Sequence, residues 1–126
     1  MSGTRRHTLT PMLVEPTDPE DVKIVALARS TRARTGAAEG ACVRDTDGRT
    51  YAAATVGLES LHLSAVQLAV AMAASSGAAG LEATAVLGDS AAAKEADLAA
   101  VRDLAGSGVT FLVAAPDGTV LRSVIT

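Results

Sequence analysis

The side chains best placed to do chemistry in this sequence are His62 and Ser64, which lie two residues apart. Their spacing is that of a His-x-Glu metal-site pattern, but Ser64 stands where the acid is needed, and no second group of ligands follows. A triad of serine, histidine and aspartate can be drawn from Ser64, His62 and Asp89, yet no nucleophile elbow surrounds the serine. We therefore interpret His62 as a histidine at the start of a helix or on the surface, and we predict no catalytic and no metal-binding residues.

Other candidate sites are equally incomplete. Gly77–Gly80 lacks the Gly-Lys-Ser/Thr ending of a phosphate loop and is interpreted as a connector. Cys42 is the single cysteine, so no intrachain disulfide can form, and a reducing, cytoplasmic setting is expected. Glu39 lies beside an apolar segment, where a buried and unpaired carboxylate would be costly. We expect it to be on the surface or paired with an arginine of the first helix.

Composition restricts the class of protein. The 126 residues fit one domain, and 27 of them are alanine, so the core must be built from small aliphatic side chains in close contact. The net charge of −3, with Phe111 and Tyr51 as the only aromatic residues, argues against nucleic-acid binding, which needs positive charge and stacking surfaces. No apolar run of 18 residues predicts a membrane span, and no secretory signal is recognised at the N-terminus.

Helix and turn signals divide the chain. Residues 1–17 have no periodicity and are expected to form a flexible tail, followed by one domain over 18–126. Asp18 and Pro19 start a predicted helix that ends at Gly36. Two apolar runs around the turn at 45–48 predict a β-hairpin over 40–56.

In the second half of the chain, segments with the apolar spacing of a helix alternate with segments typical of strands. Apolar spacing from Ser60 predicts a helix over 60–75, whose small, apolar residues suggest burial on several sides or an oligomer interface. Residues 82–87 predict a strand, and Asp89 or Ser90 is expected to cap a helix over about 91–105. In that helix Ala93, Ala96, Ala100 and Leu104 are expected inward and Asp97 on the solvated face. Strands are predicted over 109–114 and 119–125, so three helices should cover a five-stranded mixed sheet.

Several short segments, in this order, carry a family resemblance. They are Gly40-Ala41-Cys42-Val43, Asp47-Gly48-Arg49-Thr50-Tyr51, Thr55-Val56-Gly57, Leu63-Ser64-Ala65-Val66-Gln67 and Pro116-Asp117-Gly118. Together they resemble the hairpins and the ligand-bearing helix of the cytidine deaminase family over residues 18–125. The resemblance implies an α/β fold, a three-layer α-β-α sandwich with a five-stranded mixed sheet.

The same resemblance implies where the family's working residues should be. The first zinc ligand falls on Ser64 and the catalytic glutamate on Val66, and the Pro-Cys-x-x-Cys segment falls within 90–97, which contains neither proline nor cysteine. The asparagine and glutamate that hold the ribose fall on Thr55 and Gly57, and the base-stacking aromatic falls near Ala37 or Ala38. We therefore expect these to be vestigial pocket positions, with no zinc and no other cofactor.

Three functional hypotheses follow from these losses. The leading one is a catalytically inactive member that acts as an oligomeric scaffold or binding module, most simply a homodimer or homotetramer, since the family assembles around the ligand-bearing helix. The alternative is a nucleoside deaminase-like enzyme or nucleoside sensor with a remodelled pocket, in which Thr55, Ser64, Asp89 and Ser90 supply polar contacts. In a third, the missing ligands come from an active paralogue in a hetero-oligomer.

Overall fold

A computed structural model describes residues 18–126, so the predicted tail over 1–17 lies outside the described residues. This part of the chain contains three helices and seven strands. The elements, in chain order, are α1 (Pro19–Thr35), β1 (Glu39–Asp45), β2 (Thr50–Ala54), β3 (Val56–Leu58), β4 (Leu61–Leu63), α2 (Ala65–Ser75), β5 (Leu81–Gly88), α3 (Glu95–Ala105), β6 (Thr110–Ala114) and β7 (Val120–Ile125).

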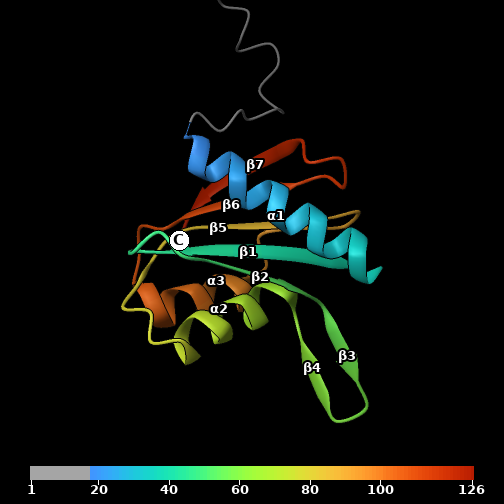
Figure 1. Cartoon of the computed structure of the whole chain (residues 1–126), viewed down its shortest axis with the longest axis horizontal. Coiled ribbons are helices and arrows are strands. Elements are labelled where there is room, and N and C mark those ends of the chain that lie inside the picture. The colour runs from blue at the N-terminus through green and yellow to red at the C-terminus, as the bar shows by residue number, and fades with distance from the viewer. Residues whose placement is uncertain (1–17) are drawn as a thin grey trace, which may run out of the picture.

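Five of the strands form one mixed sheet in the order β2-β1-β5-β6-β7. Only β5 and β6 are parallel, joined through α3, and the other neighbours are antiparallel. Helix α1 covers one face of the sheet, and α2 and α3 cover the other (Figure 1). The predicted α/β class, with a five-stranded mixed sheet between three helices, is confirmed.

The first helix forms where the capping residues predicted it. Asp18 accepts a hydrogen bond from the backbone N–H of Glu20 at 2.8 Å, Pro19 is the first helical residue, and Gly36 ends the helix with φ of 69°. Helix α1 approaches the sheet closely at Gly40, where a Cβ would overlap the carbonyl oxygen of Ala28. Gly40 therefore sets how near α1 can lie to β1.

The opposite face of the sheet carries the larger cluster of buried side chains. Phe111, Val66 and Val101 are fully buried there, together with alanines from β1 and α2. Small side chains allow α2 to pack directly on β1 and β2, as the alanine-rich composition predicts. No helix in the described 18–126 range is both long and apolar enough to cross a membrane.

The predicted helix over 60–75 is wrong in its first turn. Residues Leu61–Leu63 form β4, which pairs with β3 in a two-stranded ribbon that projects away from the sheet (Figure 1). Leu61 and His62 are exposed, so the apolar residues before Ser64 belong to this ribbon and not to the helix face. Helix α2 begins only after Ser64, because the Ser64 side chain caps it.

The predicted start of the last helix is wrong, and its inward face is right only in part, since Ala93, Ala100 and Leu104 pack against the core as predicted. Helix α3 begins at Glu95 with Lys94 at the N-cap, and neither Asp89 nor Ser90 caps it. Ala96, expected inward, is exposed, whereas Asp97, expected in solvent, is 1 % exposed. The helix can bury Asp97 because a hydroxyl group from α2 faces its carboxylate, a contact between helices that spacing within α3 does not show.

Candidate functional site

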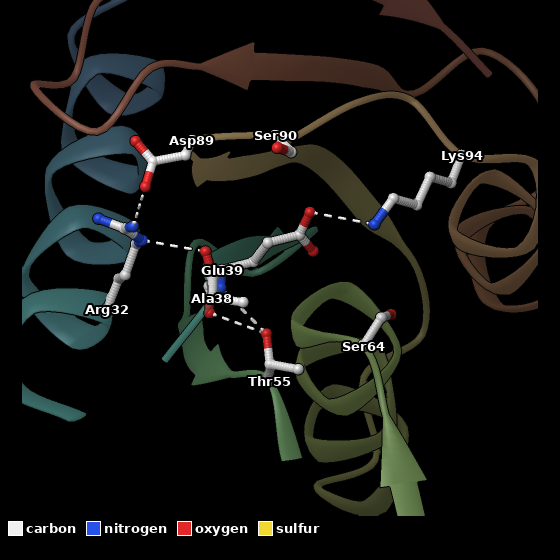
Figure 2. Close-up of a pocket in the computed structure, with 8 residues that line it drawn as sticks. All are labelled: Arg32, Ala38, Glu39, Thr55, Ser64, Asp89, Ser90 and Lys94. Carbon is white, nitrogen blue, oxygen red and sulfur yellow. Dashed lines mark hydrogen bonds and ion pairs between the residues drawn. The ribbon is translucent and has the colours of Figure 1, made fainter. Parts of the chain in front are cut away.

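A polar cavity of about 300 Å³ lies where several elements start or end. Glu39 opens β1, Asp89 and Ser90 follow β5, Thr55 separates β2 from β3, and Ser64 and Lys94 are the N-caps of α2 and α3. Figure 2 shows these side chains arranged around one space, with Arg32 of α1 at one side. Its lining residues are Arg32, Ala38, Glu39, Thr55, Ser64, Asp89, Ser90 and Lys94.

Glu39 is the buried acid of the cavity. The residue is 7 % exposed, and its Oε2 atom lies 3.2 Å from the ammonium of Lys94. Thr55 fixes the backbone here, since its hydroxyl accepts the N–H of Glu39 at 3.1 Å and its own N–H donates to the Glu39 carbonyl at 3.1 Å. The expectation of a salt-bridged Glu39 is confirmed, but its partner comes from α3 and not from the first helix.

Arg32 uses its guanidinium to bind the rim of the cavity. Its Nε donates to the carbonyl of Ala38 at 3.0 Å, and its Nη2 lies 3.2 Å from Asp89 (Figure 2). The Asp89 side chain is 82 % exposed, so this ion pair contributes little to stability. Its effect is positional, because it holds a cation at the opposite side of Glu39 from Lys94.

Ser64 connects the N-termini of α2 and α3 through hydrogen bonds beside the cavity. Its hydroxyl donates to Asp97 Oδ1 at 2.6 Å and accepts the backbone N–H of Gln67 at 3.0 Å. The Gln67 side chain returns a bond to the Ser64 N–H at 3.0 Å, which completes a capping box. Asp97 lies in the first turn of α3, where a helix dipole favours negative charge. Within residues 18–126 its Oδ2 atom is buried without a hydrogen-bond partner.

Of the vestigial pocket positions predicted from the sequence, some line the cavity and others do not. Thr55 and Ser64 line the cavity, together with Asp89 and Ser90. Ala38 lines it, while Ala37 is half buried next to it in the chain. Gly57 is exposed in β3, and Val66 is fully buried in α2.

Sequence reasoning missed Arg32, Lys94 and Asp97 as cavity or supporting residues. The energetic cost of burying the Glu39 carboxylate could have indicated a nearby cation, because a buried carboxylate must be paired. No comparable signal in the sequence identifies which of the cations that is.

The residues at the cavity do not fit a zinc ion. Zinc sites are built from cysteine, histidine and carboxylate donors around the metal. Here a hydroxyl already hydrogen-bonded to Asp97 stands beside the ammonium of Lys94, which would repel a cation. Within the described residues 18–126, no three His, Cys, Asp or Glu side chains converge.

Cys42 is separate from the cavity. The residue is fully buried in β1 on the α1 side of the sheet. Burial raises the pKa of its thiol to about 12, outweighing the smaller lowering effects of a backbone hydrogen bond and nearby cations. Cys42 is therefore protonated at neutral pH and behaves as a small core residue, as predicted.

Comparisons with known proteins agree on one family. The family described as "Cytidine deaminase-like" matches residues 17–118. The structure resembles the cytidine deaminase of Burkholderia pseudomallei, with a TM-score of 0.72 and 20 % identity, covering 82 % of this chain and 90 % of that one. It also resembles the cytidine deaminase of Mycobacterium leprae, with a TM-score of 0.66 and 19 % identity, covering 84 % and 94 % of the two chains. A mutant enzyme from Mycobacterium tuberculosis gives a TM-score of 0.64 at 23 % identity, with coverages of 75 % and 85 %. No curated protein sequence matches the chain.

Proposed function

Because the chain belongs to the cytidine deaminase-like family, and because its cavity residues do not fit a zinc ion, we propose that it is a catalytically inactive member. Its role is that of an oligomeric binding module. The family fold supplies the cavity and the assembly surface, while the residues that would perform hydrolysis are replaced.

The observation that carries this proposal is the pairing at the start of α3. Lys94 and Asp97 are three residues apart, the spacing of the two cysteines in the family's Cys-x-x-Cys segment, and Ser64 faces them from α2. The Ser64 hydroxyl donates to one oxygen of Asp97, and Lys94 pairs with one oxygen of Glu39. A hydrogen bond and an ion pair thus link α2, α3 and β1 at positions that the resemblance assigns to metal ligands, which supports a fold held together here without a metal.

Proton transfer lacks a suitable group as well. Val66, at the position of the family's glutamate, is aliphatic and 0 % exposed. Glu39 is a carboxylate on the cavity, but it is ion-paired with Lys94, and residues 18–126 place no metal-binding set beside it to lower the pKa of a water molecule. Deamination needs both an activated water and a proton carrier.

The test is ammonia release from cytidine together with metal analysis of the purified protein. We expect neither turnover above background nor stoichiometric zinc, with the Mycobacterium leprae enzyme as positive control. The triple variant Ser64→Cys, Lys94→Cys, Asp97→Cys should gain about one zinc per chain if these residues occupy the ligand positions. Stoichiometric zinc and ammonia release by the unaltered protein would refute the proposal.

Self-association is supported by the outer face of α2. Ala71, Met72 and Ala74 are exposed, and the helix carries no charged residue in its first or last turn. A groove of about 420 Å³ runs between this face and Tyr51. Apolar surface of this kind is typical of interfaces between identical subunits. We therefore infer a homodimer or homotetramer formed through α2.

Light scattering after size exclusion measures this directly. Met72→Glu should shift the protein toward monomer, whereas Val22→Glu, which places the same charge on the exposed side of α1, should not. A strict monomer at high concentration in the unaltered protein would contradict the assembly.

A second candidate, a nucleoside sensor or a nucleoside deaminase-like enzyme with a remodelled pocket, is favoured by the polar lining of the cavity, to which Thr55, Ser64 and Ser90 contribute. Sugar hydroxyls are recognised by groups of this kind. Stabilisation of the protein by cytidine in a thermal-shift assay would support it.

A further inference from the structure

We propose that the cavity beside Glu39 binds a small zwitterion, an α-amino acid with a short side chain, whose ammonium group meets Glu39 and whose carboxylate meets Lys94. This inference rests on the proposed role of the chain as a binding module and names the chemistry of its ligand.

Glu39 supplies the anionic half of the site. Only Oε2 is engaged, by Lys94, and within residues 18–126 the other oxygen, Oε1, has no hydrogen-bond partner. Figure 2 shows this carboxylate at the centre of the cavity, between Arg32 and Lys94. Because the Glu39 side chain is only 9 % exposed, a donor from a ligand in the cavity gains more at this oxygen than at a fully exposed carboxylate.

Lys94 supplies the cationic half. An ammonium group has three donors, and one of them points at Glu39. Lys94 lines the cavity and its side chain is 53 % exposed, so its remaining donors are accessible to a ligand. The Ser90 hydroxyl lies above the same space and can donate to a second ligand oxygen (Figure 2).

Charge selects among the possible ligands. A simple anion would be repelled by the buried carboxylate of Glu39, and a simple cation would be repelled by Lys94 and Arg32. A neutral nucleoside would cover the Glu39–Lys94 pair and displace water from it without bringing an opposite charge to either group, which costs solvation. A zwitterion offers each of them an opposite charge a few ångströms apart, as the Glu39–Lys94 pair itself does.

The volume of the cavity agrees with a short amino acid as its ligand. About 300 Å³ is at the low end of the range of roughly 300–1,000 Å³ for ligand pockets. A short amino acid fits such a space with a few water molecules, and a long side chain would have to leave through the mouth.

Isothermal titration calorimetry with four matched probes tests the proposal. L-serine carries both charges, glycerate replaces its ammonium by a hydroxyl, ethanolamine lacks its carboxylate, and cytidine represents the nucleoside class. We expect saturable binding of L-serine, and binding of glycerate and ethanolamine weaker by about 10- to 100-fold, which corresponds to the loss of one charge-assisted hydrogen bond.

Two variants locate the site. Glu39→Gln and Lys94→Met should each weaken L-serine binding by about 10- to 100-fold. The matched controls Glu59→Gln and Lys23→Met change exposed residues outside the cavity and should leave it unchanged. Circular dichroism checks the folding of each variant. Since Glu39 is buried and Lys94 half exposed, Lys94→Met provides the test if Glu39→Gln fails to fold.

The outcomes separate this inference from the proposed function. Binding of L-serine that requires both charges and both cavity residues supports it. Three results would overturn the inference. They are binding of cytidine in place of L-serine, binding of glycerate or ethanolamine as tight as that of L-serine, and no binding of any probe. Ammonia release from cytidine would overturn the proposed function instead, whatever the titrations show.

Discussion

Replacing Ser64 with alanine removes two hydrogen bonds at once. The hydroxyl caps α2 through the N–H of Gln67, and it donates to the buried carboxylate of Asp97 at 2.6 Å. No other residue in the described part of the chain donates to either side-chain oxygen of Asp97. The substitution therefore tests whether the link between the two helices is worth more than an ordinary helix cap.

The expected cost is the sum of two terms. Loss of a serine cap costs about 1 kcal/mol. An unsatisfied buried acceptor costs a further 1–3 kcal/mol or so, with the charged form at the upper end. Ser64→Ala should therefore lower the free energy of unfolding by about 2–4 kcal/mol. That is a large share of the roughly 5–15 kcal/mol of a typical domain.

Urea unfolding followed by circular dichroism measures the loss, with Asp18→Ala as the matched control. Asp18 caps α1 in the same way, but it is exposed and supports no buried group, so its loss should cost only about 1 kcal/mol. Combining Ser64→Ala with Asp97→Leu, which replaces the carboxylate by an apolar group of similar shape, should restore part of the stability lost in Ser64→Ala alone. If Ser64→Ala costs no more than Asp18→Ala, and Asp97→Leu only adds to the loss, the reasoning is refuted.

Three further predictions concern the sheet. Burial acts to raise the pKa of Asp45, but hydrogen bonds, that from the Tyr51 hydroxyl foremost, outweigh it and hold the pKa below its usual value. Asp45 thus stabilises the fold above its unfolded pKa of about 3.9, and this stabilisation is lost as pH falls through the folded value. Tyr51→Phe should therefore be destabilising at pH 7, and a pH series of urea titrations should show the deficit shrinking below pH 4. The Cys42 thiol, with a pKa of about 12, should react with Ellman's reagent at pH 8 only after unfolding, and fast labelling of the native protein would contradict its burial. Gly40→Ala should cost about 1–3 kcal/mol in urea titrations because its Cβ overlaps the backbone of α1, whereas Gly80→Ala, whose Cβ finds an ordinary contact at 3.5 Å, should be nearly neutral.

Most of the fold could be predicted from local signals. The Asp18 cap and Gly36 fixed the ends of α1, and the turn around Gly48 fixed the hairpin of β1 and β2, because these features depend on neighbours in the chain. The ribbon of β3 and β4 was missed because three-residue strands carry too short a pattern to separate from a helix turn. The start of α3 was misplaced because Asp89 and Ser90 have the residue types of a cap without its position.

The candidate site was predicted only in part, for a different reason. Thr55 and Ser64 were identified through the family resemblance, while Asp97 was assigned to solvent because charged side chains on a helix are usually exposed. Its burial depends on a hydroxyl group that α2 brings to it, and periodicity within α3 contains no information on that neighbour.

The sequence by itself determined which chemical groups this protein possesses: one thiol, two imidazoles and an aliphatic Val66 in the helix that resembles the ligand-bearing one. Thiols, imidazoles and carboxylates belong to side chains, so folding cannot add to their number. Only the tertiary structure decided which groups meet. It brought together Ser64 and Asp97, 33 residues apart, and Glu39 and Lys94, 55 residues apart, at hydrogen-bonding distance. The physical reason is that hydrogen bonds act over about 3 Å, so the packing of α2 and α3 on the sheet selects the partners.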